Sequence, residues 1–126
     1  MSSLSIGDKL IMNTDITVGG GEVKTGATWN GRPVYARCDE ASVTWTSGTN
    51  VFLFTAIPNI DKAVAFKSML IQSAFQANIP YLYASGGSVV EYIADVMETD
   101  GRVRYNYVFN AAGKIRCYRW YTKTTD

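Results

Sequence analysis

Histidine is absent from this chain of 126 residues, which has only two cysteines and three prolines. The absence of imidazole excludes His-based acid–base catalysis, Ser-His and Cys-His nucleophiles, and most zinc and iron sites. An excess of charge is lacking too, because 12 Lys and Arg offset 11 Asp and Glu and leave a net charge of +1. This balance gives no electrostatic reason to expect nucleic acid, an anionic membrane or a strongly acidic substrate as partner.

Long hydrophobic runs are missing as well. No apolar stretch approaches the roughly 20 residues of a membrane span, so we expect no membrane insertion. The N-terminal segment lacks a basic stretch followed by an apolar core and does not match a secretory signal. A disulfide between Cys38 and Cys117 requires a fold that brings their two strands together. We favour two buried thiols in a protein assembled in a reducing cytoplasm.

Turn signals and short extended runs are abundant. Aromatic residues make up 13% of the chain, with 8 Tyr among them, a composition that favours strands. Asn30 and Gly31 give the sharpest turn signal, because both tolerate the positive φ of a tight hairpin turn. Trp29 precedes this turn and Tyr35 ends the run after it. We expect both rings to be core anchors of a hairpin.

The rest of the chain alternates strands and turns. Residues 61–78 fit a helix capped by Asp61 or a strand, and the surrounding pattern favours the strand. Asp100-Gly101 predicts a hairpin turn, and residues 46–50 and 85–88 predict loops. The apolar run 51–57 predicts a strand buried on both faces. We expect further strands at residues 32–38, 43–45, 79–84, 89–97, 103–109 and 114–122.

About eight short strands with no confident helix predict an all-β fold, an antiparallel β-sandwich of the jelly-roll-like kind. Residues 1–21 differ in composition and end in three consecutive glycines, so we expect a short N-terminal arm followed by a sandwich domain at residues 22–126. The apolar patch Leu10, Ile11 and Met12 in this arm, with part of the run 51–57, is our candidate for contacts between subunits.

Two stretches together resemble a known family. The segment Glu22–Tyr35 contains Thr-Gly-x-x-Trp-x-Gly-x-Pro-Val-Tyr, and Tyr121–Asp126 reads Tyr-Thr-Lys-Thr-Thr-Asp. The pair resembles the C-terminal β domains of tailed-phage virion proteins, which are receptor-binding or tip modules of tail fibres, head fibres and baseplates. Residues 57–61 are also similar, and the resemblance covers roughly residues 22–126 in order.

The resemblance implies a homotrimeric β-sandwich that ends a virion appendage, binds other virion proteins and attaches to a host cell-surface glycan or protein. It implies location in the virion after assembly in the host cytoplasm. The short lead-in leaves open whether the chain is a domain of a longer protein or a small separate virion component. Two alternatives remain: a capsid-decorating or connector subunit that binds only virion proteins, and a free carbohydrate-binding module.

The sequence offers little for catalysis. Glu91 and Asp95 share a strand face by their even spacing, and such a pair suits a glycosidase or part of a calcium site. We favour a plainer interpretation, a solvated sheet face whose carboxylates are balanced by arginines at positions 102, 104 or 116. No nucleophile or metal-spacing motif is present. We therefore expect no enzyme, no catalytic residues, no metal and no cofactor.

Glycan binding calls for exposed aromatic rings with short polar groups beside them. Tyr105 and Tyr107 share one strand face, and the more polar opposite face favours a place for them in the core over an outward platform with Tyr92 on the partner strand. The loops around Trp45 and residues 81–88 are better placed. The candidate ligand-binding residues are Trp45, Tyr81, Tyr83, Ser85 and Ser88.

Overall fold

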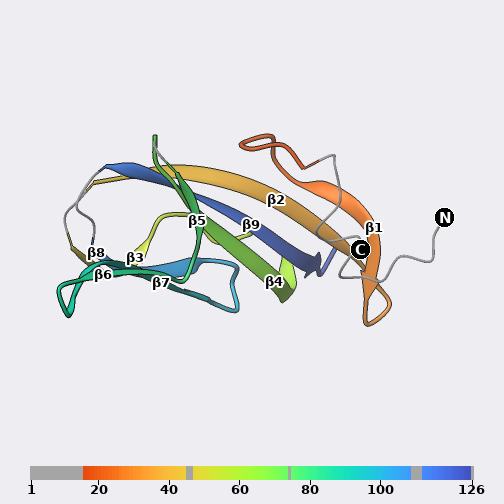
Figure 1. Ribbon diagram of the computed structural model, residues 1–126. Helices are drawn as coiled ribbons and strands as arrows, with labels where there is room; N and C mark the ends of the chain where they lie inside the picture. Colours follow the sequence, from red (N-terminus) through yellow and green to blue (C-terminus); the bar gives the residue numbers. More distant parts are fainter. Residues whose placement is uncertain (1–15, 45–46, 74, 109–111, 126) are drawn as a thin grey trace.

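The computed structural model describes residues 16–44, 47–73, 75–108 and 112–125. Within these ranges the chain forms two antiparallel sheets and no helix, which confirms the all-β sandwich (Figure 1). The five-stranded sheet has the order β1 (Val23–Trp29), β2 (Arg32–Val43), β9 (Gly113–Lys123), β4 (Ile60–Ile71) and β5 (Gln76–Asn78). The four-stranded sheet has the order β3 (Gly48–Phe52), β8 (Val103–Val108), β7 (Ser88–Met97) and β6 (Tyr81–Ser85).

Glycine turns close the tight hairpins. Asn30 and Gly31 adopt φ of 50° and 79° between β1 and β2, as their sequence predicts. Gly86 and Gly87 adopt φ of 60° and 81° between β6 and β7, so this loop is also a tight hairpin turn. The predicted turn around Gly101 joins β7 to β8. These three turns fix which strands are neighbours.

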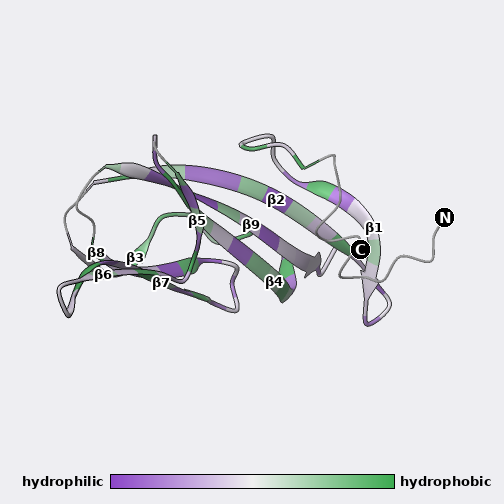
Figure 2. Cartoon of the chain, viewed as in Figure 1, coloured by the Kyte–Doolittle hydropathy of each residue, from purple (hydrophilic) through white to green (hydrophobic). Residues whose placement is uncertain are grey.

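The chain crosses repeatedly from one sheet to the other, so the two layers form one sandwich. The last strand, β9, lies between β2 and β4 and pairs with both along most of its length. Hydrophobic and hydrophilic residues alternate along β9 and β4 (Figure 2). Ile115 and Cys117 therefore face the four-stranded sheet, whereas Arg116 and Tyr118 face away from it. The predicted terminal strand and its alternation are confirmed.

The main core lies between the sheets. It joins Leu70 and Ile115 of the large sheet to Ile93, Val103 and Tyr105 of the small one. Burial of Tyr105 and of Tyr107 beside it confirms their predicted place in the core. A smaller apolar cluster lies on the outer face of the large sheet and contains Ala27, Val34, Ala36 and Trp120, with Ile16 packed against it.

The segment 51–57 corrects a prediction. Only its first two residues belong to a strand, β3, which begins already at Gly48 within the predicted turn. The rest is a loop that inserts apolar side chains into the sandwich. Phe54 packs edge-on against Tyr105, and the Ile57 amide donates to the Asp100 carbonyl at 2.9 Å. Its hydrophobicity thus reflects burial without strand pairing. Of the predicted strand 43–45, Val43 is the last residue of β2, Thr44 lies in no strand and Trp45 is outside the described residues.

Two further expectations are decided by the strands. The ambiguous segment 61–78 forms the strands β4 and β5, because β4 pairs with β9 on one side and with β5 on the other. Trp29 is not a core anchor, since 41% of its surface is exposed. Tyr35 does pack, with its ring stacked 6.3 Å from that of Tyr121.

Both cysteines are buried free thiols, in agreement with the expectation. The fold does bring their strands together, since β2 and β9 are neighbours. Cys38, however, lies opposite Tyr118, whereas Cys117 lies opposite Asp39, so the two thiols face opposite sides of the sheet. The register therefore keeps them apart.

Three segments that carry the family resemblance meet at one corner of the sandwich, which we call the terminal corner. Arg32 donates to the Lys123 carbonyl at 2.7 Å, and the Lys123 ammonium lies 2.8 Å from the Glu22 carboxylate. Asp61 accepts from Thr122 at 3.1 Å. The opening motif, the 57–61 segment and the ending motif thus form one structural unit.

The arm predicted at residues 1–21 is described only from residue 16. There, Val18 forms a parallel bridge with Cys38, and the Gly19 amide donates to the Cys38 carbonyl at 2.8 Å. The boundary at residue 22 stays a prediction. The candidate contacts Leu10, Ile11 and Met12 lie outside the described residues.

Candidate functional site

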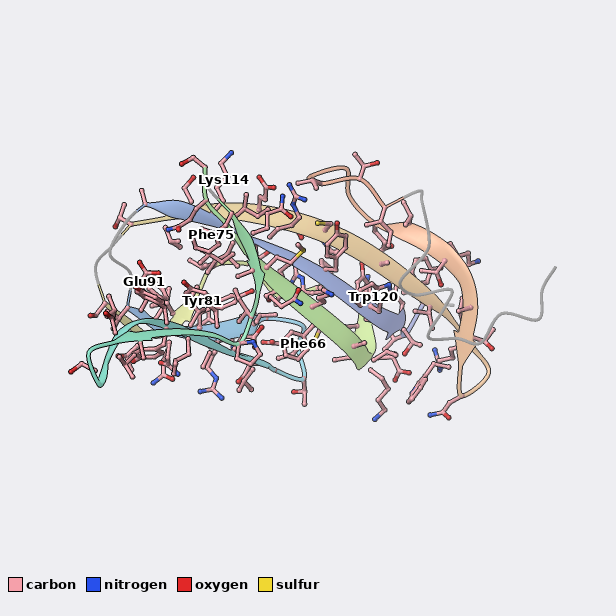
Figure 3. The ribbon with its side chains drawn as sticks, in the orientation of Figure 1. Phe66, Phe75, Tyr81, Glu91, Lys114 and Trp120 are labelled. Atoms are coloured by element: carbon pink, nitrogen blue, oxygen red, sulfur yellow. The ribbon has the colours of Figure 1, made fainter. Side chains whose placement is uncertain are left out.

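The end of the sandwich farthest from the terminal corner, which we call the distal end, carries the β6–β7 hairpin (Figure 1). Four side chains gather there from two hairpins: Phe75 from the β4–β5 loop, Tyr81 and Tyr83 from β6, and Glu91 from β7. We call them the distal cluster. Figure 3 shows three of its members, Phe75, Tyr81 and Glu91, close together at this end.

Strand register explains why the cluster forms. Tyr83 lies directly opposite Glu91 in the β6–β7 pair, and Tyr81 lies opposite Ile93. The two tyrosines and Glu91 therefore share one sheet face, where directly opposite and diagonal side chains come into contact. The Tyr81 hydroxyl donates to Glu91 Oε1 at 3.1 Å.

The second hairpin adds an aromatic wall. The ring of Phe75 lies 6.0 Å from that of Tyr81, centroid to centroid, with the planes tilted by 32°. Burial raises the pKa of Tyr81, and its hydrogen bond with Glu91 raises it further. The phenol thus stays protonated and keeps donating to the carboxylate, which holds the Tyr81 ring in place beside Phe75.

Exposure differs across the cluster. Glu91 is nearly buried at 9% exposed, whereas Phe75 and Tyr83 are 38% and 49% exposed. Ser85 and Ser88, both exposed, face each other across the Gly86-Gly87 turn beyond them. The site is therefore open: aromatic surface with a carboxylate at its base and hydroxyls at its tip.

This arrangement suits recognition of a polyhydroxylated or apolar ligand surface. The rings of Phe75 and Tyr83 offer apolar faces, and a carboxylate and serine hydroxyls are the short polar groups that fix orientation at such sites. In the described part of the chain, no three His, Cys, Asp or Glu side chains are grouped to hold a metal ion.

Four of the residues predicted from the sequence as ligand-binding lie at the distal end. The structure brings Tyr81, Tyr83, Ser85 and Ser88 together on the β6–β7 hairpin, and their role in ligand binding stays a prediction. It adds Phe75 and Glu91, which the ligand-binding prediction missed. Trp45 lies outside the described residues, although its neighbour Thr44 lines a hollow of about 500 Å³.

That hollow is separate from the distal cluster. It lies over the end of the large sheet, where the described polar side chains Ser42, Gln72, Ser73 and Lys114 surround it. Gln72 donates to the Ala112 carbonyl at 3.5 Å across one side. The hollow offers hydroxyl, amide and ammonium groups but no described aromatic ring, so it ranks behind the distal cluster as a ligand site.

The interpretation of Glu91 and Asp95 as a solvated face is wrong. Both do share a face of β7, but it is the inward one, with buried Ile93 between them. The three arginines bind other carboxylates: Arg102 pairs with Asp100, Arg104 with Glu98, and Arg116 with Glu40.

Asp95 instead belongs to a polar group inside the sandwich. Its neighbour Ser68 forms a 2.8 Å hydrogen bond with the Tyr105 hydroxyl. Burial raises the pKa of Asp95, although a hydrogen bond with Ser68 opposes this rise. Asp95 Oδ2 is buried and has no hydrogen-bond partner. This carboxyl is therefore set apart from Glu91 and from the open cluster.

Among the residues that the structure describes, no helix is long and apolar enough to cross a membrane. Comparison with family models, with curated proteins and with solved structures finds no match to this chain.

Proposed function

We propose that this protein is a virion component of a tailed phage, the tip module of a homotrimeric tail- or head-fibre appendage that attaches to the host cell surface. The observation that supports it most is that the two ends of the sandwich differ. Glu22 and Arg32, near the start of the predicted sandwich domain, meet Lys123, near its end, at the terminal corner, and the open aromatic cluster lies at the distal end (Figure 1).

Two different ends are what the tip of an appendage needs. A tip module is held by its chain ends and by other virion proteins at one end, and it must present its binding residues at the other. The Glu22–Tyr35 and Tyr121–Asp126 motifs, which resemble phage fibre domains, build the first end. Their role in this proposal is architectural, because they close the sandwich where the chain enters and leaves.

The distal cluster carries the attachment step. Phe75 and Tyr83 supply aromatic faces on which a sugar ring can stack, and Glu91 and Ser85 supply acceptors and a donor for its hydroxyls. A host cell-surface glycan is therefore the receptor class that this chemistry favours over a protein.

Two alternatives predict different behaviour. A capsid-decorating or connector subunit binds virion proteins and leaves the host surface untouched, and a free carbohydrate-binding module binds glycans without being in the particle. Electron microscopy of intact phage particles with a gold-labelled antibody against this protein tests the proposal. We expect label at the tips of tail or head fibres. Label over the capsid lattice, or none on the particle, would overturn it.

A further inference from the structure

The hollow over the end of the large sheet lies at the distal end of the sandwich, as the distal cluster does. β2 and β4 begin near the terminal corner and β9 ends there, so Val43, Ile71 and Gly113 mark the opposite end of these three strands. All three line the hollow, which has a volume of about 500 Å³. Figure 3 shows Lys114, another lining residue, at the same end as Phe75.

One short turn connects the hollow to the distal cluster. Gln72 and Ser73 line the hollow, and Phe75 of the cluster follows Ser73 by two residues. The Gln72 amide donates to the Phe75 carbonyl at 2.9 Å, which closes the turn. A glycan that stacks one sugar ring on Phe75 therefore has to cross only this turn for its next units to reach the hollow.

The lining of the hollow supplies polar groups of two kinds. Ser42 and Ser73 bring hydroxyls and Gln72 brings an amide, and such groups form hydrogen bonds with the hydroxyls of any sugar. Lys114 brings an ammonium group, which binds a carboxylate or phosphate more strongly than a neutral hydroxyl because its hydrogen bond to an anion is charge-assisted.

The charge of Lys114 has only a weak partner. Its ammonium lies 3.9 Å from Glu40 Oε1, which is beyond hydrogen-bond distance. The carboxylate of Glu40 is held by Arg116 instead, whose guanidinium lies 2.6 Å from Glu40 Oε2. The Lys114 side chain is 58% exposed, and within the described part of the chain its ammonium makes no hydrogen bond. Its three donors are therefore available to a ligand.

The excess of positive charge extends along the outer face of the large sheet. Lys114, Arg116 and Tyr118 share this face by their even spacing. Glu40 lies opposite Arg116, and Lys67 lies opposite Tyr118, so both belong to the same face. Among the described residues on the distal half of this face, three cations thus accompany one carboxylate. The net charge of +1 for the whole chain hides this local excess, which attracts anions.

We infer that the hollow is a second subsite of the attachment site and that it binds an anionic group, a carboxylate or a phosphate, of the host glycan. The distal cluster holds a sugar ring, the Lys114 ammonium pairs with the anionic group, and Ser42 and Ser73 form hydrogen bonds with the oxygens around it. This inference rests on the proposed attachment to a glycan and narrows the receptor to an acidic polysaccharide.

An array of immobilised bacterial surface polysaccharides, with neutral, carboxylated and phosphorylated polymers, tests it with the fluorescently labelled full chain. We expect the wild type to bind carboxylated or phosphorylated polymers, and the class that it binds identifies the anionic group. Lys114→Gln should weaken this binding about tenfold or more, because it removes a charge-assisted hydrogen bond.

Lys62→Gln is the matched control. It removes an exposed lysine of β4 opposite Thr122, near the terminal corner, and changes the net charge of the chain by the same amount. We expect it to bind acidic polymers like the wild type, because non-specific attraction to a polyanion depends on net charge and not on the hollow.

The array separates two kinds of failure. Binding to neutral polymers alone, binding to acidic polymers that persists in Lys114→Gln, or equal losses in Lys114→Gln and Lys62→Gln would overturn the anionic subsite while leaving attachment to a glycan intact. Binding to no polymer of any class would overturn attachment to a glycan and this inference with it.

Discussion

The guanidinium of Arg119 and the carboxylate of Asp39 meet inside the sandwich at 2.9 Å. Arg119 is 1% exposed, and it also donates to the carbonyls of Thr55 and Gly101, each at 2.8 Å. One buried charge thereby ties β9 to β2, to the loop after β3 and to the β7–β8 turn. Burial raises the pKa of Asp39, but hydrogen bonds from Arg37 and Arg119 outweigh it and hold the pKa below its usual range.

Removing this charge should be costly. Arg119→Met keeps the side-chain volume but leaves two carbonyls without their donor and Asp39 with Arg37 alone. We expect the free energy of unfolding to fall by about 3 kcal/mol or more, as for other broken buried pairs. Urea unfolding followed by circular dichroism measures it.

Arg116→Met is the matched control. Arg116 lies on the same strand and pairs with Glu40 of β2, but on the outer face, where both side chains are partly exposed. Exposed pairs contribute about 1 kcal/mol or less. Equal losses in the two variants would contradict the role given to Arg119.

Asp95 should make stability depend on pH in the direction opposite to most carboxylates. Its pKa is raised by burial, so the folded protein holds a proton that the unfolded chain has already released. The stability it contributes is complete below the pKa of the unfolded carboxyl and is lost as the pH rises through the raised pKa. Asp95→Asn should therefore gain stability over the wild type as the pH goes from about 3 to about 8.

Asp100→Asn gives the opposite sign and serves as the reference. The pKa of Asp100 is lowered, first by the backbone hydrogen bond from Arg102 and also by its guanidinium. Its stabilisation is present above the unfolded pKa and is lost as the pH falls through the folded one. Thermal melts across this pH range would refute the assignment if both variants showed the same trend.

The thiols of Cys38 and Cys117 should be unreactive in the native protein. Burial raises the pKa of Cys38 to about 11 and also raises that of Cys117. At pH near 8 neither is a thiolate, and neither is accessible. We expect iodoacetamide to modify both only after unfolding, as measured by intact mass. Rapid native labelling, or a mass lower by two hydrogens before reduction, would contradict the register that separates them.

The sequence predicts the fold best where local chemistry decides it. Asn30 and Gly31 require a tight turn because of their backbone freedom, and the structure forms it. The loop holding Phe54 and Ile57 was predicted as a strand because a run of apolar residues signals burial, and burial is satisfied here by insertion of a loop between the sheets. Local patterns cannot tell these two kinds of burial apart.

At the distal cluster too, local sequence predicts some residues and only the tertiary fold reveals the others. Tyr81 and Tyr83 could be picked from their place between Pro80 and a Gly-Gly turn. Phe75 could not, because it joins Tyr81 only through the approach of one hairpin to another. The even spacing of Glu91 and Asp95 predicts a shared face but not which one. On β7 the two carboxylates lie on the inward face, although charged residues normally lie on the outward one.

Binding of fluorescently labelled protein to host cells tests most directly whether the distal cluster attaches the protein to the host surface. Flow cytometry should show saturable binding of the wild type. Tyr83→Ala should weaken it about tenfold or more, as expected for an exposed aromatic anchor. Trp29→Ala, which removes an exposed aromatic ring at the opposite end, should bind like the wild type. Absence of saturable wild-type binding, or equal binding of Tyr83→Ala and Trp29→Ala, would contradict the claim.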